Sequence, residues 1–180
     1  MTTQIGNVYG QALYSLAASE NLSYDILEQL RVLSAEFAKE PKFVQLLSAP
    51  NISKAERCQI IDESFRNVVH PYVLNFLKIL TEKGYVRQFA QCVKAYSQQY
   101  NEEHGIIQVR AVTAIALSDK HLTKLKAKLE QLTGKQVQLE NQIDPDCLGG
   151  VRLDYEGMRL DGTIQTRLEN IRNLLKNTVL

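Results

Sequence analysis

The sequence predicts an α+β protein, with an N-terminal six-helix bundle over residues 1–105 and a small C-terminal α/β domain over residues 106–180. Apolar residues recur at helical spacing through the first part of the chain, and the period changes from 3.6 to 2 near Gly105. After Gly105, alternating segments flank one strongly helical segment. The predicted C-terminal order is therefore strand, helix, three strands and helix.

Three amphipathic helices open the chain. The second follows Asn21, with Ser23 as its predicted cap, and the third begins at Pro41 and stops before Pro50. The first carries a wide apolar stripe on a single face. The stripe comprises Ile5, Val8, Tyr9, Ala12, Leu13 and Leu16.

Three more helices complete the predicted bundle. Ser53 and Glu56 match a capping box at the start of the fourth, while Pro71 and Gly84 mark the two ends of the fifth. The fifth is apolar around more of its circumference than a peripheral helix needs. It is therefore either fully buried or presents one face to a partner. A sixth helix ends around Gly105.

Strand patterns dominate the rest of the chain. Residues 107–111 alternate as a half-buried strand, and a helix follows Ser118, with its leucines up to Leu132 inside and its lysines outside. Val137, Leu139 and Ile143 form the dry side of the next strand. Residues 151–155 and 158–160 are predicted to pair as a hairpin, before a last helix whose apolar positions run from 164 to 175.

The composition excludes several classes of protein. Lysine plus arginine total 21 against 20 aspartates plus glutamates, so the net charge of +1 does not indicate a nucleic-acid partner. The three cysteines are far apart and are predicted to be small buried groups in a reducing compartment. No stretch approaches the roughly 20 apolar residues that a membrane-spanning helix needs. The N-terminus carries no export or import signal.

No motif nominates catalytic chemistry. Gly149 and Gly150 lead into a strand and not into a helix, so they are predicted to form a structural turn and not a phosphate loop. His70, His104 and His121 are isolated, which favours surface or capping roles over metal binding. The sequence therefore predicts no catalytic residue, no metal and no cofactor. The lysines of residues 120–128 are predicted to be a solvated helix face.

Three strings together carry a resemblance to a known family. They are Tyr9-Gly10-Gln11-Ala12-Leu13, the string from Asn75 to Gly84, and the string from Ile143 to Val151 followed by Asp161-Gly162-Thr163. In this order the chain resembles the delta subunit of F-type ATP synthases, a relative of the mitochondrial oligomycin sensitivity conferring protein. That family often has alanine where Gly10 stands and arginine where Tyr85 stands. The alanine would favour a helix by about 1 kcal/mol, and no role is carried over to Tyr85.

The resemblance implies a non-catalytic stator subunit of a proton-translocating ATP synthase, which links the catalytic alpha/beta head to the peripheral stalk. In the family, a groove between the first and fifth helices receives the N-terminal helix of an alpha subunit, and the C-terminal part meets b-type stalk subunits. Carried over to this chain, the expected groove residues are Tyr9, Ala12, Leu13, Phe76 and Ile79. Phe76→Asp or Ile79→Asp is expected to weaken binding of the alpha-subunit helix without changing the helix content.

A second interpretation is a helical-bundle RNA-binding or transcription-associated factor, which the balanced charge disfavours. Under the stator interpretation, the chain is expected to be a peripheral protein at the cytoplasmic face of a bacterial cell membrane. It would reach the membrane only indirectly, through the complex.

Overall fold

The computed structural model describes residues 2–147, 149–155, 157–163 and 166. The chain divides into two compact units, residues 1–100 and 101–180, and the division falls inside the last helix of the helical region. The elements belong to the α+β class that the sequence predicts: helices come first, and a mixed sheet with one further helix follows. Each unit has a hydrophobic core of its own.

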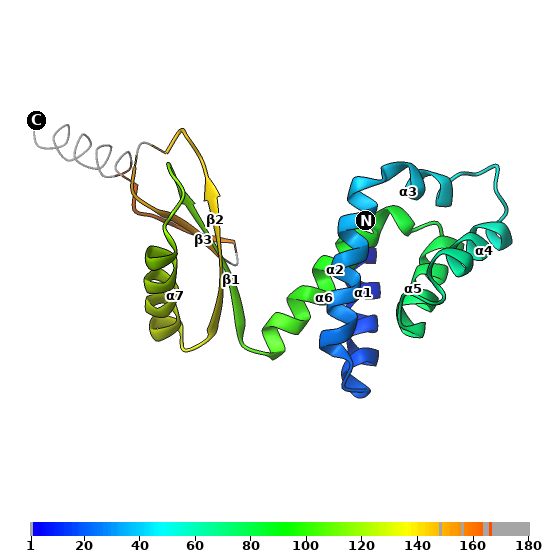
Figure 1. Ribbon diagram of the computed structural model, residues 1–180. Helices are drawn as coiled ribbons and strands as arrows, with labels where there is room; N and C mark the ends of the chain where they lie inside the picture. The colour runs from blue at the N-terminus through cyan, green and yellow to red at the C-terminus, as the bar shows by residue number, and fades with distance from the viewer. Residues whose placement is uncertain (1, 148, 156, 164–165, 167–180) are drawn as a thin grey trace, which may run out of the picture. The chain divides into compact units, whose positions relative to one another are not determined.

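Unit 1 contains a helix at each of the six predicted places, together with one short 3-10 helix (Figure 1). Contacts link α4 to α5, and both α1 and α2 to α5. Their closure into a six-helix bundle stays a prediction. The helices are α1 (Thr2–Ser19), α2 (Ser23–Lys39), α3 (Pro41–Leu47), α4 (Lys54–Phe65), α5 (Pro71–Glu82), η1 (Val86–Gln88) and α6 (Phe89–Glu103).

Aromatic residues join the helices of unit 1. Phe37 of α2 lies 5.1 Å from Phe89 of α6 and 6.1 Å from Phe65 of α4, measured between ring centroids. In the middle of α6, Tyr96 is fully buried, and its hydroxyl donates a hydrogen bond of 2.9 Å to the carbonyl oxygen of Ser23. Burial raises the pKa of Tyr96, so its hydroxyl stays protonated and able to donate. These contacts hold α6 against α2.

Local signals set most helix ends in unit 1. The predicted capping box of α4 is present: the Glu56 amide donates to Ser53 Oγ at 3.2 Å, and the Ser53 amide donates to Glu56 Oε2 at 3.0 Å. At the start of α5, His70 Nδ1 accepts a hydrogen bond from the Tyr72 amide, which is a capping role. Gly84 follows the end of α5 with a positive φ of 75°.

The predicted cap of α2 is wrong. Asn21 adopts a positive φ of 58°, and the Leu22 amide closes the end of α1 by donating to the Ala17 carbonyl. This turn makes Leu22 the N-cap of α2 and places Ser23 in the first turn, where no side-chain cap bond forms. The end of one helix therefore fixes the start of the next.

Unit 2 is built on a four-stranded sheet in the order β2-β1-β3-β4. The strands are β1 (Ile106–Thr113), β2 (Gln136–Ile143), β3 (Arg152–Tyr155) and β4 (Met158–Asp161). β1 and β2 are parallel, and α7 (Asp119–Thr133) connects them. β3 pairs antiparallel with both β1 and β4, so the predicted hairpin between β3 and β4 is present.

α7 lies along one face of this sheet (Figure 1). Leu129 of α7 packs against a small core formed by Ile107, Val109 and Val137. Two predicted interior residues are outside this core: Leu132 is 73% exposed at the end of α7, and Ile143 is 54% exposed at the end of β2. Helical and strand spacing identify the inward face of an element, but they do not show where the covering element stops.

One polar residue, Asn141, lies on the same face of β2 as the core residues Val137 and Leu139. The Asn141 side chain donates to the Ala111 carbonyl and to Thr113 Oγ1, both at 2.9 Å, and accepts from the Leu117 amide at 2.8 Å. These bonds tie the segment between β1 and α7 to β2. The alternating pattern gives no sign of this role.

Two of the three predicted buried cysteines lie inside the protein, and all three are free thiols. Cys92 and Cys147 are buried, and burial raises the pKa of the Cys92 thiol to about 11. Cys58 is only half-buried on α4, with its sulfur 3.8 Å from Glu82 Oε1 of α5. The prediction of buried cysteines is therefore wrong for Cys58. The predicted last helix lies outside the described residues.

Candidate partner-binding surfaces

The outer face of α1 carries apolar side chains that the core does not cover. Val8 is 60% exposed and Leu16 is 44% exposed, and Ala12 between them is also exposed. Ile5 and Tyr9 lie on the same side of the helix and are half-buried. We call Ile5, Val8, Tyr9, Ala12 and Leu16 the α1 stripe. Its positions follow the i, i+3, i+4 and i+7 spacing with which one helix packs against another.

Two glycines on the side of α1 that faces α6 set the distance between these helices. A Cβ at Gly10 would lie 2.4 Å from the carbonyl oxygen of Cys92 and 2.9 Å from the Ala95 Cβ. A Cβ at Gly6 would lie 2.8 Å from the Gln91 Cβ. Only glycine permits this approach of the two helices. The departure from the family pattern at Gly10 thus fits the close contact with α6.

α5, which contacts α1, contributes one exposed and one buried candidate residue. Ile79 is 44% exposed, whereas Phe76 is only 6% exposed and packs in the core. Leu13 of α1 is similarly buried at 5% exposure. Of the five residues predicted for the groove, Ala12 and Ile79 are thus exposed, Tyr9 is partly exposed, and Leu13 and Phe76 belong to the core. Their roles in binding stay predictions.

Tyr85 adds an aromatic ring that the sequence reading left without a role. Its ring centroid lies 6.0 Å from that of Tyr9, and both residues pack against the core while staying partly exposed. Tyr85 directly follows the turn at Gly84 and connects the α1 stripe to the end of α5. A tyrosine pair of this kind offers a large rigid contact area to a partner.

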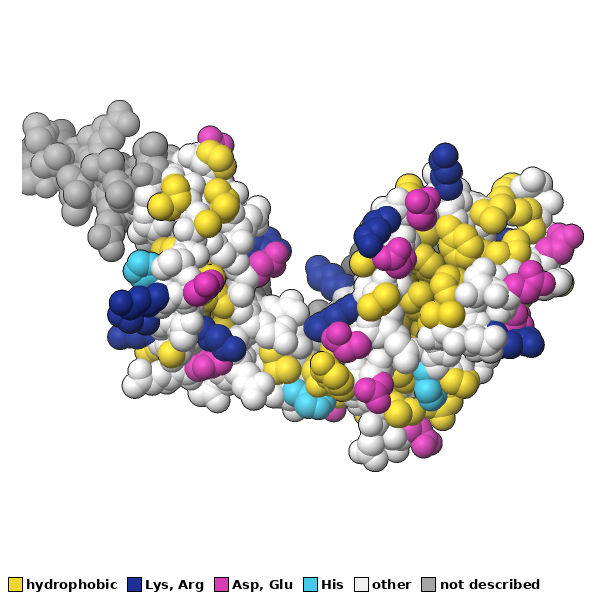
Figure 2. Space-filling view, viewed as in Figure 1, with side chains coloured by type: hydrophobic (Ala, Val, Ile, Leu, Met, Phe, Trp, Pro, Cys, Tyr) yellow, Lys and Arg dark blue, Asp and Glu magenta, His cyan; other side chains and the backbone are white. Residues whose placement is uncertain are grey.

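A second part of unit 1 also shows apolar side chains. Figure 2 shows hydrophobic side chains gathered between α2 and the pair α4 and α5. The half-buried rings of Phe43 and Phe65 lie 5.9 Å apart, and each packs on Phe37. α4 is also joined to α5 by an ion pair, in which Lys78 Nζ of α5 lies 2.6 Å from Asp62 Oδ1. This ammonium group lowers the pKa of Asp62 and joins α4 to α5.

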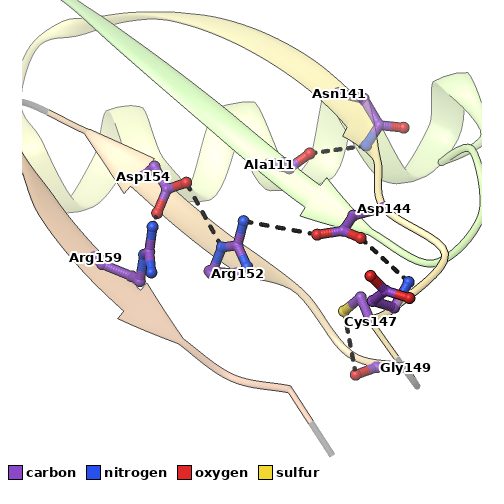
Figure 3. Close-up of polar contacts among 9 residues, drawn as sticks. Ala111, Asn141, Asp144, Cys147, Gly149, Arg152, Asp154 and Arg159 are labelled. Atoms are coloured by element: carbon purple, nitrogen blue, oxygen red, sulfur yellow. Dashed lines mark hydrogen bonds and ion pairs between the residues drawn. The ribbon is translucent and has the colours of Figure 1, made fainter.

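Unit 2 presents charged side chains on the sheet face opposite α7. Figure 3 shows Arg152 between two carboxylates: its Nη2 lies 4.0 Å from Asp144, and its Nε lies 3.6 Å from Asp154. Arg159 of β4 completes the row, with its Nε 3.0 Å from Asp154. The acids and bases compensate one another, so this network joins β3, β4 and the segment after β2.

Gly149 and Gly150 lie in the segment before β3 with positive φ angles of 143° and 89°. A Cβ at Gly150 would lie 2.6 Å from the carbonyl oxygen of Gly162 and 2.8 Å from the Thr163 Cα. Both the backbone angle and the close approach therefore favour glycine at this position. Gly162 also donates its amide to the Val151 carbonyl at 3.1 Å. The segment thus packs against the exit of β4.

Neither a metal cluster nor a membrane helix is found in the part of the chain that the structure describes. No group of three histidine, cysteine, aspartate or glutamate side chains among these residues is arranged to hold a metal ion. Every described helix is too short or too polar to cross a bilayer.

A helical unit with an uncovered apolar stripe, followed by a small mixed-sheet unit, defines a two-part α+β protein that assembles with other proteins. Comparison with known proteins identifies the assembly. The family described as "ATP synthase delta (OSCP) subunit" matches residues 5–175, and the chain belongs to that family. It is thus a structural subunit of an F-type ATP synthase and a component of its stator.

Relatives from several bacteria match the whole chain. ATP synthase subunit delta of Alkaliphilus oremlandii is 32% identical, with all of both chains covered. The protein of the same name from Clostridioides difficile is 29% identical over 99% of each chain. A chain in the mitochondrial ATP synthase hexamer of Toxoplasma gondii shares the fold, with a TM-score of 0.75 at 18% identity over 94% of this chain and 96% of that one. The family match selects the stator interpretation over the RNA-binding alternative.

Proposed function

We propose that the chain ties the catalytic head of the ATP synthase to its peripheral stalk, with unit 1 binding the head and unit 2 binding the stalk. Such a link keeps the head from turning with the rotor, so that rotation is coupled to ATP synthesis. The task requires binding surfaces and no reacting group. The chain accordingly acts without catalysing a reaction and without a cofactor.

The α1 stripe supports the head-binding role most strongly. Val8, Ala12 and Leu16 are exposed at four-residue intervals, and the pair Tyr9 and Tyr85 extends the apolar surface toward the end of α5, the helix on which Ile79 is exposed. An amphipathic helix can cover such a surface with its own apolar face. The proposed occupant is the N-terminal helix of an alpha subunit. Covering an apolar surface along a whole helix favours slow dissociation, which suits a link under torque.

Unit 2 is the proposed stalk-binding part, and b-type subunits are its proposed partners. The chain would then contact the membrane only through the complex, as a peripheral protein at the cytoplasmic face of a bacterial cell membrane. The bacterial relatives that match over the full chain support this location.

The head-binding role is tested with a peptide of the alpha-subunit N-terminus in isothermal titration calorimetry. Val8→Asp and Ile79→Asp each place a charge in the proposed contact, and we expect each to weaken affinity by at least about tenfold. Val32→Asp on α2 is a matched control, because Val32 is 61% exposed and Val8 is 60% exposed. All three variants should keep the helix content of the parent chain.

Burial of Phe76 alters the outcome expected for Phe76→Asp. A carboxylate in the core would disrupt folding, so circular dichroism should show lost helix content in this variant. The exposed positions therefore give the cleaner test. Unchanged peptide affinity in both Val8→Asp and Ile79→Asp would overturn the proposed contact.

A further inference from the structure

The outer face of α7 carries a row of positive charge. Lys120, Lys124 and Lys128 are exposed and recur at four-residue intervals, and Leu132 continues the row with 73% exposure. Figure 2 shows Lys and Arg side chains clustered on unit 2 in the region that α7 occupies in Figure 1. We call Lys120, Lys124, Lys128 and Leu132 the α7 stripe. Residues this far apart on a helix span about 18 Å along its axis.

The lysines of the α7 stripe have no acidic partner among the described residues. The ion pair found on α7 joins Lys126 to Glu130 at 3.9 Å, and Lys126 points away from the stripe. Repulsion between lysines four residues apart destabilises a helix. Lys120 also lies in the first turn, where the helix dipole disfavours a cation. The electrostatic energy of the lysine row is thus unfavourable in the isolated unit. An anionic partner would make it favourable.

The geometry favours a helix as that partner. Acidic residues at four-residue intervals on a second helix are spaced along its axis by the same distance as the lysines on α7, so each acid can face one lysine. An apolar residue on that helix would cover Leu132. A lipid surface fits less well, because Leu122, Leu125 and Leu129 are turned toward the sheet side of α7 and cannot insert into a membrane. Nucleic acid fits less well too, since no aromatic residue accompanies these lysines for base stacking.

We propose that the α7 stripe is the docking surface for an acidic amphipathic helix and that, in the ATP synthase, a stalk subunit supplies this helix. The inference rests on the proposed function, because it assigns a surface to the stalk contact of unit 2. The three lysines would attract the acidic helix electrostatically, and Leu132 would add one apolar contact. The affinity of the chain for the stalk should therefore fall as ionic strength rises.

The test uses the full-length chain and the soluble part of the b-type stalk subunits as the titrant in calorimetry. The double variant Lys124→Glu with Lys128→Glu should bind the stalk at least about tenfold more weakly at low salt, and the difference should narrow at high salt. Lys126→Glu is the matched control, since it makes the same charge reversal on another side of α7. It should bind the stalk like the parent chain.

Each outcome has a distinct meaning. If the parent chain and the double variant bind the stalk equally, the inference is wrong and the proposed function stands. If the parent chain binds the alpha-subunit peptide but not the stalk, the stalk role itself fails and the inference fails with it. If the double variant loses binding only to phosphatidylglycerol vesicles, the stripe is a lipid contact and the docking proposal is overturned.

Discussion

Gly10 shows how one absent side chain sets the distance between two helices. Its Cα faces the backbone of α6, and a Cβ would lie 2.4 Å from the Cys92 carbonyl oxygen. The position is therefore governed by the neighbouring helix and not by helix propensity. Packing of this kind holds α1 in place while the α1 stripe stays open to a partner.

We predict that Gly10→Ala destabilises unit 1 although alanine is the better helix former. Alanine would gain about 1 kcal/mol of propensity, but forcing a methyl group into a closed contact costs typically about 1–3 kcal/mol. Urea denaturation should show a net loss of stability. Gln11→Ala, an exposed position on the same helix, should cost nothing measurable. Equal stability of Gly10→Ala and the parent chain would show that α1 and α6 are farther apart.

We predict a pH-dependent coupling between Asp62 and Lys78. Lys78 lowers the pKa of Asp62 below its ordinary value of 3.8. The stabilisation is therefore fully present above that value and is lost as pH falls through the lowered pKa of the folded state. A double-mutant cycle with Asp62→Asn and Lys78→Gln should show coupling at neutral pH that disappears in acid. Coupling that persists after Asp62 is protonated would contradict this account.

Residues whose roles depend on distant neighbours could not be predicted from the sequence. Asn141 stands among apolar positions of β2, and its partners Ala111 and Leu117 come from other segments. Tyr85 gains significance only because Tyr9 lies beside it. In contrast, Ala12 and Ile79 could be nominated, since their positions follow from helical spacing and from the family resemblance. The same grounds also predict Leu13 and Phe76 as groove residues, although both are buried.

At the scale of elements, local chemistry explains which helix ends could be predicted. Ser53 and Glu56 satisfy each other's backbone within four residues, so the start of α4 is readable from the sequence. Pro71 and Gly84 similarly mark the two ends of α5. The same reasoning predicts Ser23 as a cap, but the turn at Asn21 makes Leu22 the N-cap of α2. A serine side chain caps a helix only from the N-cap position, and Leu22 holds that position in α2.

We predict that these two serines respond differently to substitution. Ser53→Ala removes a capping bond and should reduce stability by about 0.5–2 kcal/mol. Ser23→Ala should cost less, because Ser23 makes no cap bond in α2. Thermal or urea unfolding of both variants measures the difference. A larger loss for Ser23→Ala would mean that α2 begins differently from the structure.

Elements of unit 2 were predictable in kind but not in extent. The alternation of β1 and β2 and the spacing of α7 identify their buried faces. Leu132 and Ile143 nevertheless lie beyond the covered area and are exposed. Hydrophobic periodicity shows which side of a helix or strand faces the core. Whether a residue on that side is buried depends on how far the neighbouring element extends over it. The exposure of Leu132 is what completes the α7 stripe.

At the scale of the whole molecule, the two units offer different binding surfaces. Unit 1 exposes an apolar row on α1, and unit 2 exposes a basic row on α7. The change of hydrophobic period near Gly105 indicated two parts, and the structure divides after Tyr100, within α6. The basic row on α7 could not be inferred from the net charge of +1, because that value sums the charges of both units. The family match identifies the ATP synthase as the assembly to which the chain belongs, and we propose that both surfaces bind other subunits there.

The central claim is that the chain links the head to the stalk, and reassembly tests it most directly. Membranes stripped of both the soluble ATPase and this subunit are mixed with purified ATPase, with or without the chain, and then sedimented. The account predicts that ATPase activity returns to the membrane fraction only when the chain is present, and that Ile79→Asp reduces this recovery. ATPase that binds the stripped membranes equally well without the chain would contradict the account.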